Sequence, residues 1–235
     1  MSDSASMGGA MTPVKQPGHV SPSRRERARA TRLRITEAAY ALFCERGYLG
    51  TTMADIADLA GVAVQTVYFT FHTKSDVLGS TYELAVVGEG DPAPPQMQPW
   101  YASAVAEPDV ARALRWVVEG AGEIVRRVAP LDIVVRTAAE SDPDTARVLS
   151  HSEQLRVDGY REVIDLLRAK SELRRGLTRE RATHLLLLYV GPAVYRALVV
   201  DCAWTHAEWV DWTTATVLEQ VFGVTDSEAG LESPA

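Results

Sequence analysis

The 235-residue sequence is poor in cysteine and lacks the short motifs that mark many enzymes and metal-binding proteins. Its two cysteines, Cys44 and Cys202, lie far apart, so the sequence offers no disulfide framework and favours a reducing compartment. No pair of histidines has the HExxH spacing of a zinc site, and no serine lies in a G-x-S-x-G motif. From these absences we expect no catalytic residue, no metal and no cofactor, and we predict that the protein is not an enzyme.

The sequence also lacks a long uninterrupted apolar run and the alternating pattern of β-strands. Its most apolar stretch, residues 185–200, contains Gly191 and Pro192, and we expect it to be too short and too interrupted to span a bilayer. Residues 1–23 are rich in Ser, Gly and Pro without an apolar centre, which predicts a disordered leader and not a signal peptide. The polar residues 225–235 are likewise expected to be disordered. Together these features predict a soluble, cytoplasmic protein.

The chain as a whole has fewer basic than acidic residues, and its net charge is −7. This balance argues against a protein that coats nucleic acid over its entire surface. The basic residues are concentrated near the front, where residues 24–34 contain six arginines and one glutamate. This stretch is interpreted either as a solvated helix start or as an arm near phosphates, and both interpretations can hold. A basic front and an acidic remainder suggest two tasks on one chain.

Helical patterns fill the first third of the sequence. Apolar residues recur at the spacing of one helical face between Ile35 and Phe43, in a helix that we expect to end at Gly47. A second helix is expected to begin after Thr52, whose hydroxyl can cap it, and to turn Leu59 inward. A tight turn then leads to a short third helix. This order predicts a helix-turn-helix, which places one short helix in the major groove of DNA.

The short third helix is expected over residues 63–69, with Val67 on its inner side and Phe71 closing the small core. Thr73 is placed to cap the next helix, which should run to about Val87. A proline-rich break follows at residues 88–99. The remainder is predicted to be helical over 108–128, 131–138 after a break at Pro130, 142–170, 179–200 with a kink at Gly191 and Pro192, and 205–222.

The run from Thr52 to Lys74, TMADIADLAGVAVQTVYFTFHTK, resembles the DNA-binding signature of the TetR family of bacterial transcriptional regulators. The capped helix, the Ala-Gly-Val turn and the Tyr, Phe and Lys that follow occur in the family's order and spacing. The resemblance covers the first third of the chain. It implies an all-α fold, with a three-helix helix-turn-helix domain at residues 24–88 and a helical ligand-binding and dimerisation domain at residues 89–224.

The resemblance also implies which residues meet DNA. Thr52 and Lys74 would hold phosphate, while Tyr68 and its neighbours would lie at the major groove. The predicted DNA-binding residues are Arg29, Arg32, Thr52, Ala63, Val64, Gln65, Thr66, Tyr68, Phe69, Thr70, His72 and Lys74. The chain departs from the family at Ala63, where a capping Ser or Thr is usual, and this loss costs about 1 kcal/mol. Contacts of Gln65 with adenine and of Val64 with a thymine methyl are hypotheses.

One short recognition helix makes too few contacts to specify a DNA site, so we predict a homodimer that reads two half-sites about 34–36 Å apart. The last two helices are the expected dimer face because they are long and apolar. Its candidate residues are Leu185, Leu188, Tyr189, Val199, Trp209, Trp212 and Val217. The alternative is that these residues form the core of a single chain.

The middle helices are predicted to enclose a small-molecule pocket, and in the family such a ligand shifts the helix that begins at Lys74. Candidate lining residues are Trp100, Trp116, Arg136, His151, Tyr160 and Tyr189. Each has a simpler interpretation: Arg136, for example, can pair with Asp132 one turn earlier, and aromatic residues at helical spacing are usually core.

The sequence therefore predicts a ligand-responsive transcriptional regulator, a repressor that binds a palindromic operator as a dimer and is released by a small molecule. Its expected partners are double-stranded DNA, a second copy of the chain and an unidentified effector, with no membrane. The alternative is a helical protein-interaction adaptor whose helix-turn-helix binds no specific DNA. The arginine-rich start and Lys74 favour the first interpretation.

Overall fold

The computed structural model describes residues 23–88 and 93–224, so the predicted leader and the tail at residues 225–235 lie outside the described residues, apart from Ser23. The described residues contain helices and no strand, which confirms the predicted all-α class. The front half comprises α1 (Arg24–Arg46), α2 (Met53–Ala60), α3 (Val64–Phe71) and α4 (Lys74–Val87). The rear half comprises α5 (Pro99–Ala106), α6 (Val110–Ala139), α7 (Pro143–Arg168), α8 (Arg179–Tyr189), α9 (Pro192–Tyr195) and α10 (His206–Val217). A 3-10 turn (Pro95–Met97) precedes α5, and π-helical turns (Arg196–Asp201 and Leu218–Phe222) follow α9 and α10.

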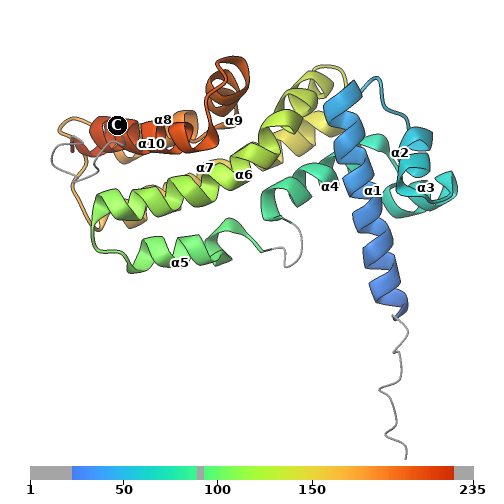
Figure 1. The fold of residues 1–235 in the computed structure, drawn as a ribbon, viewed down its shortest axis with the longest axis horizontal. Coiled ribbons are helices and arrows are strands. Elements are labelled where there is room, and N and C mark those ends of the chain that lie inside the picture. The colour runs from blue at the N-terminus through green and yellow to red at the C-terminus, as the bar shows by residue number, and fades with distance from the viewer. Residues whose placement is uncertain (1–22, 89–92, 225–235) are drawn as a thin grey trace, which may run out of the picture.

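The long helix α6 is the centre of the molecule. Figure 1 shows α5 along one side of α6, α8 and α10 along the other, and α1 to α4 gathered around its C-terminal end. Helix α6 packs against α7, α5, α4 and α10. It therefore contacts both halves of the chain.

Two hydrophobic cores reflect this arrangement. The rear core is built on residues such as Leu114 and Val118 of α6 with Ile164 of α7. The front core surrounds Phe43 and also takes in Leu131 and Val135 from the far end of α6. Because burial of apolar surface stabilises both clusters, the same helix contributes to the stability of each.

Local signals set most helix boundaries as predicted. Capping boxes begin α2 at Thr52, α4 at Thr73 and α10 at Thr205. Gly61 ends α2 in the left-handed conformation, with φ 63°, which glycine adopts without steric cost. Asp142 caps α7 and accepts from the backbone of its first turn, as the Asp-Pro pair indicated.

Pro130 does not break the helix, so the prediction of separate helices at 108–128 and 131–138 is wrong. Helix α6 runs without interruption from Val110 to Ala139. Pro130 is exposed, while its neighbours Ala129 and Leu131 are buried in the cores. Packing on both sides therefore outweighs the one backbone hydrogen bond that Pro130 cannot donate.

Two further expectations need correction. Helix α5 was not predicted: it begins at Pro99, which suits a first helical position. Leu59 is 57% exposed, because Met53, Ile56 and Ala60 occupy the inward face of the two-turn helix α2.

The helix predicted over 179–200 with a kink at Gly191 and Pro192 is interrupted there, since α8 ends at Tyr189, Gly191 has an extended backbone and α9 begins at Pro192. Within the described residues, the segment Arg179–Asp201 is long and apolar enough, by length and composition alone, to cross a membrane, with mean hydropathy 1.5. Only 33% of the most apolar 18-residue stretch in this segment is buried in the fold. Much of its apolar surface is therefore uncovered in the single chain.

Candidate DNA-binding surface and ligand cavity

Helix α3 is held to the front core by its inner side and exposes its outer side. Val67 and Phe71 are buried in the core, which confirms their predicted positions. Gln65 and Tyr68 are exposed, and Phe69 is 86% exposed. Tyr68 and Phe69 thus place two adjacent aromatic side chains on the outer side of α3.

The remaining predicted residues of α3 are less free to contact DNA. Val64 is half-buried and packs partly against the front core. Thr70 is half-buried, and its hydroxyl donates to the Thr66 carbonyl oxygen at 2.7 Å. Ala63 is exposed and makes no side-chain cap, as its chemistry predicted. His72 is exposed and ends the helix with φ 56°, a conformation that few residues other than glycine adopt.

The N-terminus of α2 presents Thr52 at an exposed position. Its hydroxyl oxygen accepts from the backbone of Asp55 at 3.1 Å and donates to the Asp55 carboxylate at 2.6 Å. These hydrogen bonds from Thr52 lower the pKa of Asp55. Thr52 thus already caps the backbone N–H of Asp55 before any phosphate approaches.

Lys74 has protein partners in place of the predicted phosphate. Its ammonium donates to the carbonyl oxygens of Tyr48 at 2.8 Å and Thr51 at 3.0 Å, and it lies 4.1 Å from the centre of the Tyr48 ring. Burial lowers the pKa of Lys74. In this conformation Lys74 fastens α4 to the connection between α1 and α2 and so supports the start of α2.

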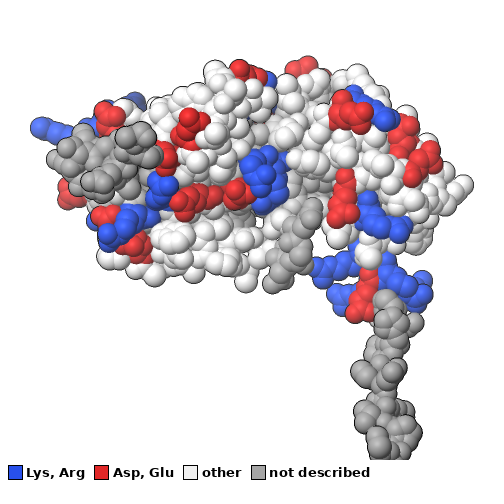
Figure 2. Space-filling model, in the orientation of Figure 1, with Lys and Arg blue, Asp and Glu red and all other residues white. Residues whose placement is uncertain are grey.

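The predicted DNA-binding arginines of α1 differ in whether they have partners within the chain. Arg29 is exposed, whereas Arg32 donates to the Ser80 hydroxyl at 2.6 Å and lies 4.3 Å from the centre of the Phe71 ring. Figure 2 shows basic side chains gathered around the start of α1. The exposed start of this helix is thus the part best placed for phosphates.

A cavity of about 840 Å³ lies between α4, α5, α6 and α7 and extends to Phe71 at the end of α3. Of the predicted lining residues, it brings together Trp100, His151 and Tyr160. Trp100 lies against Gly120, where an added Cβ would come within 2.6 Å of three indole atoms. The cavity wall is therefore closely packed at this point.

The other three predicted lining residues do not line this cavity. Trp116 is exposed on α6, and Tyr189 packs edge-on against Trp212 with ring centres 6.0 Å apart. Arg136 donates to Asp132 at 2.7 Å, the pairing that the sequence offered as its simpler interpretation. Their aromatic or polar character alone did not distinguish these positions from true lining residues.

Helix α4 supplies a wall of the cavity that the sequence reasoning missed. Gly79, Tyr82, Glu83 and Val86 line it at the spacing of one helical face. That spacing was present in the sequence, but the same pattern also fits a helix that packs only on its own core. The helix that lines the cavity is also the one that directly follows the recognition helix.

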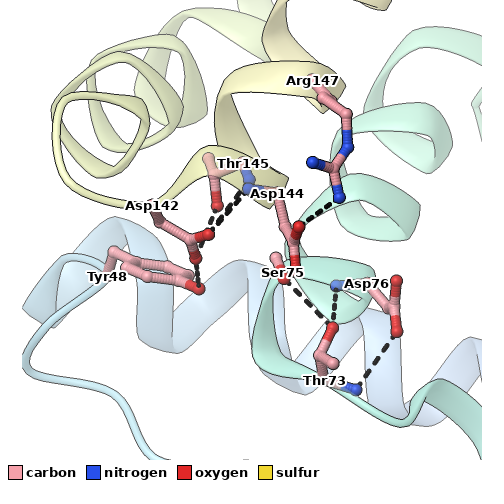
Figure 3. A network of polar contacts seen from close by, with 8 residues as sticks. All are labelled: Tyr48, Thr73, Ser75, Asp76, Asp142, Asp144, Thr145 and Arg147. Carbon is pink, nitrogen blue, oxygen red and sulfur yellow. Dashed lines mark hydrogen bonds and ion pairs between the residues drawn. The ribbon is translucent and has the colours of Figure 1, made fainter.

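A second connection joins the halves, between α7 and the α1–α2 connection (Figure 3). The Tyr48 hydroxyl donates to the Asp142 carboxylate at 2.7 Å, and Thr145 donates to the same carboxylate at 3.1 Å. The hydrogen bond from Tyr48 is the largest cause that lowers the pKa of Asp142, and burial raises the pKa of Tyr48 to about 12. Asp142, the N-cap of α7, is therefore hydrogen-bonded to the α1–α2 connection, whose carbonyl oxygens also accept from Lys74.

The predicted dimer face divides into core and surface residues. Trp209 and Val217 are fully buried in the rear core of the single chain, so they are not available to a partner. Their burial follows from the inward side of α10 packing on α6. Leu188 is 53% exposed, and the other candidates, Leu185, Tyr189, Val199 and Trp212, are half-buried.

Comparison with known proteins agrees with the helix-turn-helix. Residues 35–81 match the family model for bacterial regulatory proteins of the tetR family. Over 54 residues the chain is 44% identical to the HTH-type transcriptional regulator TtgR of Pseudomonas putida, covering 23% of this chain and 26% of TtgR. Over 67 residues it is 33% identical to the HTH-type transcriptional regulator AcrR of Shigella flexneri, covering 28% of this chain and 31% of AcrR. The similarity to these curated relatives thus spans less than a third of their length.

Solved structures share the fold of both halves. NalD of Pseudomonas aeruginosa, described as the secondary repressor of the MexAB-OprM multidrug efflux pump, superposes with a TM-score of 0.64 at 20% identity, covering 84% of this chain and 98% of NalD. FadR from Bacillus subtilis, solved with stearoyl-CoA, gives 0.65 at 16% identity, covering 80% and 98%. Residues 35–81 thus carry the signature of the tetR family of bacterial regulatory proteins, and the chain shares its helical fold with these solved structures.

Proposed function

We propose that the protein is a DNA-binding transcriptional repressor whose affinity for a palindromic operator falls when a small molecule fills the cavity. The observation that carries the proposal is the position of α4, which lines the cavity and directly follows the recognition helix α3. A ligand in the cavity therefore contacts the element that holds α3 in place.

The proposed DNA surface is the outer side of α3 with the exposed ends of α1 and α2. Gln65 has the paired donor and acceptor that suit adenine in the major groove, and Phe69 offers an apolar contact to a thymine methyl. Arg29 and the first arginines of α1 reach phosphate. This set is narrower than the sequence suggested, because Arg32 and Lys74 already have partners within the chain.

The proposed dimer face is the uncovered apolar surface of α8 and the turn after α9. Leu188 and Val200 are more than half exposed, and the rings of Tyr189, Trp204 and Trp212 form a connected aromatic group beside them. Two copies joined here would hold two recognition helices for two half-sites about 34–36 Å apart.

Release from DNA follows from differential affinity. A ligand lowers operator binding only if it binds more tightly to dimers whose recognition helices are wrongly spaced for the operator. Because α4 and the Tyr48–Asp142 hydrogen bond both join the cavity helices to the front half, a change in cavity shape is transmitted to α3 by two routes.

The proposal is tested by footprinting the protein on the DNA upstream of its own coding region. We expect a protected palindrome and an affinity that falls steeply with salt, since bound phosphates release counterions. The matched variant Phe69→Ala should weaken binding to the palindrome more than to a scrambled duplex. Equal binding of both duplexes by the wild type would instead support a protein-interaction adaptor.

The dimer face is tested with Leu188→Glu, which places a charge in the apolar surface. We expect gel filtration at micromolar concentration to change from dimer to monomer, because an unpaired buried charge is strongly unfavourable at an interface. Val105→Glu on α5 is the control, since Val105 is similarly exposed but lies away from this surface. A wild type that elutes only as a monomer would contradict the proposed mode of operator reading.

A further inference from the structure

Two buried tyrosines of the cavity wall differ in whether their hydroxyl groups have a partner. Tyr160 of α7 donates to the Val190 carbonyl oxygen at 2.6 Å. Tyr82 of α4 is 8% exposed and lines the same cavity, but its hydroxyl makes no hydrogen bond within the described residues. Because a buried donor without an acceptor is unfavourable and uncommon, the Tyr82 hydroxyl indicates an acceptor that the chain alone does not supply.

The hydroxyl oxygen of Tyr82 is open to the cavity. Among the described residues, the side-chain polar atoms that are both fully enclosed and unpaired are Asp132 Oδ1, Trp209 Nε1 and Thr213 Oγ1. The Tyr82 oxygen is unpaired but is not one of these enclosed atoms, so it retains accessible surface. Since the side chain as a whole is buried in the cavity wall, that surface faces the cavity. A molecule in the cavity can therefore reach the hydroxyl.

The Tyr82 side chain is a neutral phenol at neutral pH. Burial raises the pKa of Tyr82 to about 12, and the charge of Asp132 adds to this rise. A neutral phenol has one proton to donate, and buried donors are left unpaired more rarely than buried acceptors. The group that best complements Tyr82 is therefore a hydrogen-bond acceptor, such as a carbonyl oxygen.

The charges near Tyr82 are balanced, which favours a neutral ligand. The charged residues that act on its hydroxyl are Asp132, Glu153, Arg136 and Arg156. Arg136 pairs with Asp132 at 2.7 Å and also with Glu153, and Arg156 pairs with Glu153 at 2.7 Å. Within this group of four, no cation is left unpaired to offset the cost of burying an anionic ligand group.

The rest of the cavity offers an apolar surface that extends away from Tyr82. On α6 the lining residues run from Val117 to Val128, eleven residues apart, which corresponds to about 16 Å along the helix axis. Tyr82 lies near the Val128 end, because Asp132, one turn beyond Val128, acts on its hydroxyl. Trp100 packs on α6 near the Val117 end. The cavity thus has a hydroxyl toward one end and an indole ring toward the other.

We propose that the Tyr82 hydroxyl is the polar recognition group of the ligand site, which takes a neutral, mainly apolar molecule carrying a carbonyl or another hydrogen-bond acceptor. The hydroxyl donates to that acceptor, while the apolar body lies along α6 toward Trp100. The inference rests on the proposed function, because it names the class of molecule that the cavity binds. A ligand held in this way is bonded to α4, the helix that directly follows the recognition helix.

The test uses three probes with one naphthalene body: 2-acetylnaphthalene, 2-isopropenylnaphthalene and 2-naphthoate. The alkene has the shape of the ketone but carries a CH₂ group in place of the carbonyl oxygen, and the naphthoate carries an anionic acceptor. Binding to the full-length protein is measured by equilibrium dialysis. We expect the wild type to bind the ketone more tightly than the naphthoate, since no unpaired cation among the four charged residues near Tyr82 receives the carboxylate.

The variant Tyr82→Phe removes the hydroxyl and keeps the ring. We expect it to bind the ketone about fivefold more weakly and the alkene with unchanged affinity, because one neutral hydrogen bond is lost from the ketone complex alone. Without a probe, its thermal midpoint should not fall, since the hydroxyl has no partner among the described residues.

Tyr195→Phe is the matched control. Tyr195 is also a buried tyrosine, but it lies outside the cavity wall, and its hydroxyl is hydrogen-bonded to His206 Nδ1 at 3.1 Å. Its loss should leave the affinities for the ketone and the alkene unchanged.

The outcomes separate this inference from the proposed function. An unchanged ketone affinity in Tyr82→Phe, an equal loss for ketone and alkene, or tighter binding of the naphthoate than of the ketone overturns the acceptor site but leaves a ligand cavity. Absence of binding for every probe overturns the acceptor site as well. Failure of the footprinting experiment, by contrast, overturns the regulator without affecting these dialysis measurements.

Discussion

At the scale of single residues, Lys74 is the clearest case in which a family motif and the surrounding structure assign different roles. The motif implies a phosphate contact, whereas the ammonium donates to Tyr48 and Thr51 carbonyl oxygens and is partly buried. In the proposed function, a lysine in this position supports DNA binding indirectly, by holding the start of α2 in place.

The salt dependence of DNA binding distinguishes these roles. We expect Lys74→Gln to weaken operator binding while leaving the slope of log affinity against log salt unchanged. Arg29→Ala should reduce the slope by about 0.9 for each phosphate that the variant no longer neutralises. Fluorescence anisotropy titrations between 50 and 200 mM salt, roughly the range over which such slopes are measured, provide the readout. A reduced slope in the Lys74→Gln variant would restore the phosphate role.

Gly120 is a second residue whose side chain, or lack of one, decides local packing. Gly120→Ala would place a Cβ 2.1 Å from the Trp100 ring, so the indole must leave its position. Overpacking of this kind costs about 1–3 kcal/mol. We expect a lower thermal midpoint and altered tryptophan fluorescence.

Gly159→Ala is the matched control for this substitution, because its added Cβ would meet only Gln96 Nε2 at an ordinary 3.6 Å. Equal midpoints for the two alanine variants would show that Trp100 moves without cost.

At the scale of elements, the periodicity of apolar residues predicted most helices, since capping residues such as Thr52 and Asp142 act within one turn of their own position. The helix across Pro130 could not be predicted in this way, because it depends on the packing of Leu131 and on the solvent beside Pro130, which lie outside the local sequence. The lining role of Tyr82 was missed for the same reason, since only the tertiary fold distinguishes a cavity wall from a core.

The recognition helix α3 lacks a side-chain cap, and this deficiency can be repaired. Ala63 has the extended backbone of an N-cap, with φ −68° and ψ 144°. Ala63→Ser adds an acceptor for the first backbone N–H groups of α3 and should stabilise the helix by about 1 kcal/mol. We expect slower amide hydrogen exchange in α3 and operator affinity raised by about fivefold. Ala63→Val, which has no acceptor, should produce neither effect.

At the scale of the whole molecule, the Tyr48–Asp142 hydrogen bond joins the halves independently of α4. Tyr48→Phe removes this bond but keeps the ring beneath Lys74. We expect the variant to be less stable at neutral pH and to release DNA less completely when the cavity is filled, because one of the two connections is removed.

The pH dependence of this effect has a definite sign. The folded-state pKa of Asp142 lies below its ordinary value of 3.8, so its contribution is present above that value and is lost as the pH falls through the folded pKa. The stability difference between wild type and Tyr48→Phe should therefore narrow from pH 6 to about pH 3, near the reference pKa of aspartate. Urea unfolding at each pH measures it, and a constant difference would exclude Asp142 as the acceptor that matters.

Because α6 belongs to both cores, its packing determines where mutations that impair the protein are expected to lie. Since Leu114 and Leu131 of one helix stabilise opposite halves, loss of packing in either core withdraws support from the other. For the repressor proposed above, we therefore expect mutations that relieve repression to be scattered through the rear core, far from DNA, and many of them to act only at raised temperature. A raised temperature would then weaken operator binding, as the proposed effector does. Selection for tight repression would therefore also select for a stable protein.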